Sequence, residues 1–347
     1  MNIGIIGAGA IGRKHAAAAG QSGANVRWVV DVDLAQAQEL AKEHGAEAAD
    51  SADALWADRA TSAVIVAVPN KWHADVAIAA LDAGKDVLLE KPMACTVAEC
   101  QAINQAALAN GRVLQVGFVH RFTAVGRLAK SLADEGRCGR IYHARAQLSL
   151  RRGVPGLGKW FTTKEISGGG ALIDVGVHLI DLALHVMDYP QLSDVCGQTY
   201  ATFGCRMKEY DYDSMWSGPP DYEGVFNVED AAHALVRFRN GSTLQLDVAW
   251  AGNFPQPSTP VSSMVFLGDR GGMSFELFGD HVNLAAEQEG KIVDQRIDAA
   301  EPDFYQDQLR VFLDGVTTRS NSGATGVQGE IVQSIVEQIY QGAMIPA

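Results

Sequence analysis

A lysine beside a proline is one candidate catalytic residue of the sequence. Lys91 lies in Glu90-Lys91-Pro92, directly after the apolar run 87–89, and the proline restricts the backbone that carries it. A lysine held at the end of a strand can bind a hydroxyl group and offset negative charge on oxygen. The alternative interpretation is a surface ion pair between Glu90 and Lys91 in a loop.

An aspartate and a histidine form the second candidate set. Asp174 and His178 follow the three glycines 168–170 within a helical pattern that runs to about residue 187. Their spacing of four residues predicts that both side chains lie on one helix face. They are candidates for acid–base chemistry, and the alternative is a buried, hydrogen-bonded pair that packs one domain on the other.

The same stripe continues through Asp181 and His185, which raises the question of a metal site. From Asp174 to His185 the helix rises by about 16 Å at 1.5 Å per residue, so the four side chains cannot hold one ion. Two of these ligands with outside donors are the alternative, but no other cluster of His and Cys in the sequence offers partners, so we predict no metal. For Asp181 and His185 a buried, satisfied polar role is favoured.

A glycine-rich turn, residues 7–12, predicts a dinucleotide site. Gly7 permits the tight turn, Gly9 lets a pyrophosphate approach the backbone, and Gly12 lets helix and strand pack closely. Ala10 and Ile11 open the following helix, whose free N–H groups are suited to phosphate.

An acid after the second apolar run points to the choice of cofactor. Asp31 is placed to accept hydrogen bonds from the hydroxyl groups of the adenosine ribose, while Asp33 is a candidate helix cap. Because Asp31 would repel a 2′-phosphate and is followed by Val32 and not by arginine, NAD is favoured over NADP. Further cofactor contacts are expected at two other strand ends, from Pro69, Asn70, His73, Glu90 and Lys91.

The elements that must position these residues begin with an alternation of strands and helices. The runs 3–6, 26–30, 63–68, 87–89 and 113–116 are apolar at nearly every position, as in strands buried on both faces of a parallel sheet. Helical patterns cover 34–43, 73–83 and 95–110, the last with a capping box from Thr96 and Glu99 and an exit at Asn110-Gly111. Residues 1–120 are thus predicted to form a doubly wound, Rossmann-type α/β domain.

The second half of the sequence has a different order of helical and strand-like patterns. A helix over 123–135 leads into strand-like runs at 141–150, 195–203, 232–238, 243–249, 261–267 and 273–278, and helices follow at 303–316 and 326–340. Asn240-Gly241 between two runs predicts a two-residue hairpin turn. Residues 121–347 are therefore predicted to form an α/β domain with a large, mostly antiparallel open sheet that binds substrate and mediates oligomer contacts.

Composition narrows the possible partners and location. The 41 acids exceed the 28 lysines and arginines, for a net charge of −13, which weighs against nucleic-acid binding. No run approaches the roughly 20 uninterrupted apolar residues of a membrane span, and the first strand leaves no room for a signal peptide. The five cysteines are never spaced as CxxC, so we expect reduced thiols in a cytoplasmic protein with no membrane partner.

The combination of motifs resembles the Gfo/Idh/MocA family, named for glucose–fructose oxidoreductase, inositol dehydrogenase and a rhizopine-catabolism protein. The residues that carry the resemblance are the 7–12 turn, Asp31, Glu90-Lys91-Pro92, Gly117 with Arg121-Phe122, the run 168–181 and Val228-Glu229-Asp230. The resemblance covers nearly the whole chain. It implies an NAD(P)-dependent oxidoreductase that acts on a sugar, inositol or related polyol, and a homodimer or homotetramer built by packing open sheets together.

Some positions depart from the family pattern. His120 precedes Arg121 where many relatives carry asparagine or arginine, and Phe161 follows Trp160 where arginine is frequent. An aromatic, acidic insertion covers 207–226 and includes Tyr210, Tyr212, Trp216 and Tyr222. Trp160, Trp216 or Trp250 could stack on a sugar ring, although packing is the favoured role for each. These departures leave the identity of the substrate open.

Oxidation of a carbinol needs a base, and histidine is suited to that task near neutral pH. His178 is the expected general acid/base, Lys91 would stabilise the developing alkoxide, and Asp174 would orient His178 or bind a neighbouring hydroxyl. Lys91 is an alternative proton acceptor. The expected substrate-binding residues are Lys91, Arg121, Trp160, Asp174 and His178, with the reacting groups converging beside the nicotinamide.

Two other functions are compatible with the same motifs. Relatives on this scaffold cleave glycosides through a transient oxidation by tightly bound NAD, and such an enzyme would release sugar without net NADH. A non-catalytic sensor that binds NAD and a partner protein is the third possibility. The presence of Lys91, Asp174 and His178 weighs against the sensor, because a sensor needs no acid–base set.

Overall fold

The computed structural model describes residues 1–210, 215–255, 261–300 and 303–342. The chain divides into two compact units, one formed by Met1–Val119 with Asp303–Gln333 and the other by His120–Pro302 with Ser334–Ala347. The sequence predicts that residues 303–333 belong to the second domain. They belong instead to the first unit because helix α9 (Phe304–Thr318) buries Leu309, Phe312 and Val316 in its hydrophobic core.

The first unit is built on a six-stranded sheet in the order β3-β2-β1-β4-β5-β6, with all neighbouring strands parallel. The strands are β1 (Asn2–Ile6), β2 (Asn25–Val30), β3 (Glu47–Ala49), β4 (Ala63–Val66), β5 (Asp86–Leu89) and β6 (Leu114–Val116). Every residue of β4 and β5 is buried, as the continuous apolar runs predicted. The short edge strand β3 was not predicted because none of its residues is fully buried.

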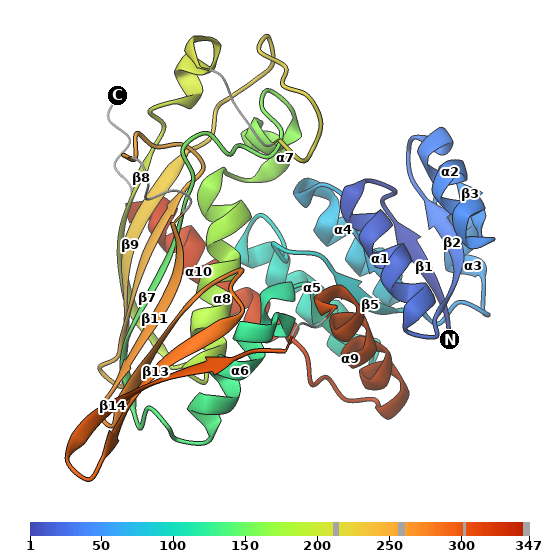
Figure 1. Ribbon diagram of the computed structural model, residues 1–347. Coiled ribbons are helices and arrows are strands. Elements are labelled where there is room, and N and C mark those ends of the chain that lie inside the picture. Colours follow the sequence, from blue (N-terminus) through green and yellow to red (C-terminus); the bar gives the residue numbers. More distant parts are fainter. Residues whose placement is uncertain (211–214, 256–260, 301–302, 343–347) are drawn as a thin grey trace. The chain divides into compact units, whose positions relative to one another are not determined.

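Helices cover both faces of this sheet (Figure 1). Helices α1 (Ala10–Gln21), α2 (Leu34–His44) and α9 share one hydrophobic core with Ile3 and Ile5 of β1. On the opposite face Leu55 of α3 (Asp53–Ala57) lies against β1 at Gly4, and α4 (His73–Asp82) packs on α5 (Val97–Ala109). The Thr96–Glu99 capping box of α5 is present as predicted.

The second unit contains an eight-stranded sheet in the order β14-β13-β12-β11-β7-β10-β9-β8. The strands are β7 (Ile141–Ser149), β8 (Leu192–Tyr200), β9 (Ala231–Phe238), β10 (Thr243–Ala249), β11 (Val261–Gly268), β12 (Gly271–Glu276), β13 (His281–Gln288) and β14 (Lys291–Asp298). Strands β7 and β10 pair in parallel and the other recorded pairs are antiparallel, which confirms the predicted mostly antiparallel sheet. Helix α8 (Val177–Val186) packs on β7 and β10, and α6 (Ala124–Asp134) packs on β12 and β13 (Figure 1).

The hairpin between β9 and β10 was predicted, but its loop is one residue longer than expected. The N–H of Phe238 donates to the carbonyl of Ser242 at 3.0 Å, which leaves Arg239, Asn240 and Gly241 in the loop. Gly241 has φ +84°, the left-handed conformation that closes a three-residue hairpin with a bulge.

A long apolar helical segment crosses the second unit. It consists of α7 (Lys164–Ser167), the π-helical turn η4 (Leu172–Gly176) and α8. By length and composition the run Lys164–Val186 could cross a membrane, but 83% of its most apolar window is buried inside the fold. That burial is typical of a core helix in a globular domain.

Candidate functional site

The glycine turn between β1 and α1 has the geometry that its sequence predicted. Gly7 has φ +100°, and a Cβ there would lie 2.3 Å from the carbonyl oxygen of Ala67. A Cβ on Gly12 would lie 1.9 Å from the carbonyl oxygen of Gly7, so only glycine permits this approach. Beside Gly9, by contrast, no heavy atom of the described residues lies within 4 Å of the Cβ position. The turn and packing roles are confirmed, and the space at Gly9 fits the approach of a pyrophosphate.

The start of α1 is suited to an anion. Its N-cap, Gly9, has no side chain, and its first turn, which lies wholly in the described part of the chain, contains no acid. The first N–H groups of α1 therefore retain their capacity for phosphate oxygens, in a helix whose N-terminus carries partial positive charge. Ala10 and Ile11 occupy this first turn.

Asp31 ties the end of β2 to the glycine turn. Its Oδ2 accepts a 2.7 Å hydrogen bond from the N–H of Ala8, and its Oδ1 accepts one of 2.9 Å from the N–H of Asp33. Asp33 caps α2 through the N–H groups of Ala35 and Gln36, as predicted. The carboxylate of Asp31 is thus fixed beside the turn, and the neighbouring Val32 is 94% exposed.

Glu90 is part of a buried pair beneath Lys91. Glu90 is 8% exposed, and its Oε1 accepts a 2.7 Å hydrogen bond from Nε2 of the fully buried His15. Burial acts to raise the pKa of Glu90, but the hydrogen bond and charge of His15, together with the charge and N–H of Lys91, outweigh it and leave this pKa below its ordinary value. A surface Glu90–Lys91 ion pair is therefore wrong: Glu90 anchors the loop from within, and its Oε2 accepts the N–H of half-buried Lys91 at 3.1 Å.

His73 joins the loops that follow β4 and β5. Its Nδ1 lies 2.7 Å from the carbonyl oxygen of Pro92 and its Nε2 lies 2.8 Å from that of Val68. Burial lowers the pKa of His73, against the opposite effect of the two carbonyl groups. Because both ring nitrogens are engaged, His73 supports these loops and is not retained as a direct cofactor ligand. Pro69 and the buried Asn70 lie in the loop after β4, where Pro69 is the N-cap and Asn70 the first residue of η1 (Asn70–Trp72).

In the second unit, a buried acid fixes the start of the helical segment that carries Asp174 and His178. Oε1 of Glu229 accepts hydrogen bonds of 2.9 Å from the N–H groups of Gly170 and Leu172 and from the hydroxyl of Tyr340. Burial raises the pKa of Glu229. In the sequence, Val228-Glu229-Asp230 contributes only to the family resemblance, because no neighbouring residue indicates which N–H groups Glu229 contacts.

The turn that carries Asp174 is π-helical. The N–H of Val177 donates to the carbonyl of Leu172, five residues earlier, and α-helix geometry begins only at Val177. The α-helical spacing used to place Asp174 and His178 on one face therefore does not apply across this turn. Single π turns within helices occur frequently at functional sites.

Asp174 is held by a tryptophan that lies 76 positions away in the sequence. The indole Nε1 of Trp250 donates a 3.1 Å hydrogen bond to Oδ2 of Asp174. Asp174 is 8% exposed and Trp250 is 1% exposed, so Trp250 cannot present its face to a sugar ring. Its observed contact fixes the direction of the Asp174 carboxylate.

We expect Trp250→Phe to impair catalysis without unfolding the protein. Phenylalanine fills most of the same apolar space but removes the donor, and a hydrogen bond to a charged group contributes about 1.5–3 kcal/mol. Steady-state kinetics should show kcat/KM lower by about 10- to 100-fold. The matched control is Trp216→Phe in the insertion, where the indole is 52% exposed. Equal kinetics in both variants would contradict a role of Trp250 in holding Asp174.

His178 lies against a second imidazole. Its ring centroid is 4.6 Å from that of His120 and the two rings meet edge to face at 83°. His120 lies in η2 (Val119–Phe122), and its ring also contacts Phe278 at 5.5 Å. Both histidines are half-buried. The fold thus places the ionisable ring of His120 beside His178, at the start of α8.

Arg121, expected to bind substrate, is engaged elsewhere. Its Nε and Nη2 donate to Asp181 at 2.8 and 2.6 Å, and Nη2 also contacts the hydroxyl of Tyr189. Arg121 and Asp181 are 5% and 1% exposed, so the pair is buried. We therefore do not retain Arg121 as a substrate ligand. Asp181 is buried and satisfied as predicted, with Arg121 and Tyr189 as the partners.

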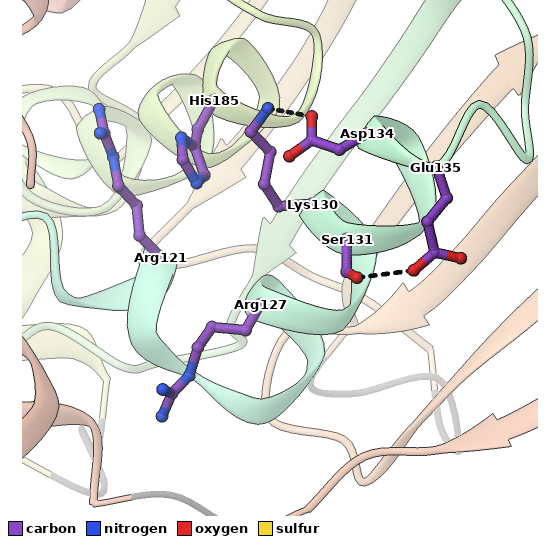
Figure 2. A pocket seen from close by; sticks show the side chains of 7 residues that line it. All are labelled: Arg121, Arg127, Lys130, Ser131, Asp134, Glu135 and His185. Carbon is purple, nitrogen blue, oxygen red and sulfur yellow. Dashed lines mark hydrogen bonds and ion pairs between the residues drawn. The ribbon is translucent and has the colours of Figure 1, made fainter. Parts of the chain in front are cut away.

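A cavity of about 480 Å³ borders this pair (Figure 2). Its lining residues are Arg121, Arg127, Lys130, Ser131, Asp134, Glu135 and His185. Lys130 donates to Asp134 and Ser131 donates to Glu135, so the lining contains both positive and negative side chains. Burial, with the charge of Arg121, lowers the pKa of His185 to about 4. Among the described residues no three His, Cys, Asp or Glu side chains gather as a metal site.

Aromatic side chains gather around loop 151–162. Trp160 stacks on Phe161 at 3.7 Å, and Trp216 of the insertion meets Phe161 edge to face at 5.3 Å. Tyr210 and Tyr222 pack on the small core that contains Trp250. Tyr212 lies outside the described residues. The insertion is therefore joined to the core that supports Asp174.

Comparison with known proteins identifies the class. Residues 1–118 match the model of the oxidoreductase family with an NAD-binding Rossmann fold, and residues 127–280 match the GFO/IDH/MocA C-terminal domain. The chain therefore belongs to the Gfo/Idh/MocA family of oxidoreductases and its first unit is an NAD-binding Rossmann domain. The glycine turn, the open start of α1 and the placement of Asp31 fit that cofactor.

Individual relatives agree with this assignment. The chain is 31% identical over 346 residues to D-glucoside 3-dehydrogenase of Escherichia coli (strain K12), covering 99% of this chain and 95% of the relative. It is 30% identical over 257 residues to levoglucosan dehydrogenase of Pseudarthrobacter phenanthrenivorans, covering 70% and 65%. Two solved structures share the fold: levoglucosan dehydrogenase with NADH and levoglucosan (TM-score 0.85, 23% identity, coverage 99% and 97%) and GenD2 from gentamicin A biosynthesis with NAD (TM-score 0.78, 25%, 99% and 94%).

Proposed function

We propose that the protein is an NAD-dependent dehydrogenase that oxidises a ring hydroxyl group of a glucoside, another sugar or a polyol such as inositol. The observation that carries the proposal is the arrangement around η4 and α8, where Trp250 fixes the Asp174 carboxylate and an ionisable histidine follows at 178. The relative that aligns over nearly the whole chain is a glucoside dehydrogenase, which supports a carbohydrate substrate.

The NAD-binding unit would hold the cofactor through its glycine turn and Asp31. Bound there, the nicotinamide would supply the hydride acceptor for oxidation of the substrate carbon. The pyrophosphate is assigned to the space beside Gly9 and the first turn of α1, and the ribose hydroxyls to Asp31. A preference for NAD over NADP follows from the negative charge of Asp31 and from the absence of a cationic side chain at the neighbouring position 32.

We expect Asp31→Ala to weaken binding of NAD more than binding of NADP. The substitution removes the acceptor for the ribose hydroxyls and also the charge that repels a 2′-phosphate. Titration of each cofactor followed by protein fluorescence gives the two Kd values. Asp33→Ala, which removes a helix cap and no ribose acceptor, is the control. Equal loss of both cofactors in Asp31→Ala would show that Asp31 does not contact the ribose.

The chain's own residues divide the remaining tasks. His178 takes the hydroxyl proton, Lys91 donates a hydrogen bond to the developing alkoxide, and Asp174 holds a neighbouring hydroxyl. Lys91 belongs to the NAD-binding unit, whereas Asp174 and His178 belong to the other unit. The proposal therefore requires both units to act on one substrate molecule, and this convergence stays a prediction.

A screen of NAD reduction tests the function. Purified protein is incubated with NAD and a panel of inositols, aldoses, glucosides and their keto forms, with absorbance of NADH as the readout and sugar release measured in parallel. Turnover on a sugar or polyol with one NADH formed per keto product supports the proposal. Release of sugar without net NADH would identify glycoside cleavage, and retained NAD without turnover on any compound would favour a sensor.

We also propose that the chain forms a homodimer or homotetramer through the outer face of the eight-stranded sheet. Large apolar side chains are exposed there on β8, β9 and β11, namely Tyr200, Leu235 and Leu267. The strand register places all three on one face, where polar side chains such as Arg145, His233 and Gln245 lie between them. Analytical ultracentrifugation of the protein and of Leu235→Glu measures whether this face mediates assembly.

A further inference from the structure

The His120–His178 contact has a consequence for acid–base chemistry, and it rests on the proposed role of His178 as the base. The two ring centroids are 4.6 Å apart within one compact unit. Two positive charges at that distance repel each other, which weakens binding of the second proton by on the order of five-fold in water and several hundred-fold at an effective dielectric constant near 20. The two rings therefore titrate as a pair.

The edge-to-face arrangement is compatible with one charged ring and one neutral ring. Aromatic pairs of this geometry place the positive edge of one ring against the negative face of the other. Phe278, whose ring also contacts His120, brings no charge to the pair. The contact thus opposes double protonation and tolerates single protonation.

Other charged groups near α8 are largely paired among themselves. Asp181, three residues after His178, is neutralised by Arg121, which adjoins His120 in the chain. On α6, which packs against α8, Lys130 is paired with Asp134. Asp174 on η4 is an exception, because its recorded partner, the indole of Trp250, is neutral and offsets no charge on the carboxylate. The pKa of His185 is lowered to about 4, so His185 is neutral near pH 7. Strands β7 and β10 also pack on α8, and their charged or titratable side chains are Arg145, His143 and Asp247. These positions alternate with buried ones, so the three side chains lie on the sheet face opposite the buried side chains.

From this geometry we propose that His120 is a positioning residue that keeps His178 in its neutral, proton-accepting form at mildly acidic pH. While the pair holds one proton, that proton is shared between the rings, so His178 remains neutral in about half of the molecules when the two affinities are similar. The neutral fraction of a solitary histidine would instead fall about tenfold for each pH unit below its pKa. The device widens the acidic range over which the base operates.

The test follows the histidine ring signals by NMR from pH 5 to 8 in labelled protein without substrate, with kcat/KM measured over the same range. In the unmodified protein, His178 should titrate in two steps, and kcat/KM should fall to about half before the second, lower step. In His120→Phe, which keeps an aromatic ring without a charge, His178 should titrate in one step that lies above the second step of the unmodified protein, and below that step kcat/KM should fall about tenfold per pH unit. In His120→Arg, a fixed cation should move the single step to lower pH.

Phe278→Leu is the matched control, because it changes a ring that touches His120 and removes no titratable group. It should keep the two-step titration. A His178 curve that is the same in the unmodified protein, His120→Phe and His120→Arg, each folded by circular dichroism, would overturn the inference. Since the NMR measurement needs no substrate, loss of coupling in an active enzyme would refute the inference alone, whereas coupling without turnover on any sugar would refute the proposed function.

Discussion

Replacing His178 by alanine is expected to lower kcat by about 10²- to 10⁴-fold and to leave NAD affinity nearly unchanged. A positioned general base contributes acceleration of that size, and alanine cannot accept the hydroxyl proton. His178 lies on α8 of the second unit, whereas the NAD-binding residues lie in the first, so cofactor binding should persist. Steady-state kinetics on the substrate found in the screen, with NAD titration by fluorescence, measure both quantities.

His185→Ala is the control for this experiment, because His185 is carried by the same helix two turns later. It should turn over substrate at nearly the rate of the unmodified protein at pH 7. Turnover by His178→Ala at the unmodified rate would remove His178 from the mechanism. Partial recovery of its activity by added imidazole would support the assignment of the base to this position.

Replacing Lys91 by methionine is expected to lower kcat by about 10²- to 10³-fold. Methionine keeps most of the length of the side chain but offers neither charge nor a donor to the developing alkoxide, and loss of one such donor has effects of this order. Because the loop is held from within by the buried Glu90–His15 pair, its backbone should remain in place in the variant.

Lys71→Met provides the matched control, since Lys71 follows the neighbouring strand β4 and its side chain is exposed. It should have little effect on kcat. An unchanged kcat in Lys91→Met would exclude Lys91 from the reaction. If Lys91→Ala is rescued by added methylamine and His178→Ala is not rescued by imidazole, Lys91 is the proton acceptor and His178 has another role.

The sequence by itself determined the features that depend on local chemistry. Continuous apolar runs specified the fully buried strands β4 and β5, because a strand covered on both faces has no polar side. Gly7 and Gly12 specified the turn, because only glycine permits their backbone angles and approach distances. Thr96 with Glu99, and Asp33, specified helix starts through hydrogen bonds that span three residues or fewer.

Strands without a clear apolar face could not be predicted from local sequence patterns. In β14 the first four residues are exposed although two of them are apolar, so neither alternation nor a buried run marks the strand. Helix α9 was recognised as a helix, but its own pattern shows only that one face is apolar. Which sheet that face covers is decided by packing in the tertiary structure.

The partners of the site residues were also decided by tertiary structure alone. Trp250 contacts Asp174, which lies 76 positions away in the sequence, and Arg121 contacts Asp181, which lies 60 positions away. His120 contacts His178, which is also distant in the sequence. Periodicity along one helix reports which side chains share a face, and even that rule changes at the π turn 172–176. Which donor or charge occupies the space opposite that face depends on strands far away in the chain, and therefore on the packed fold.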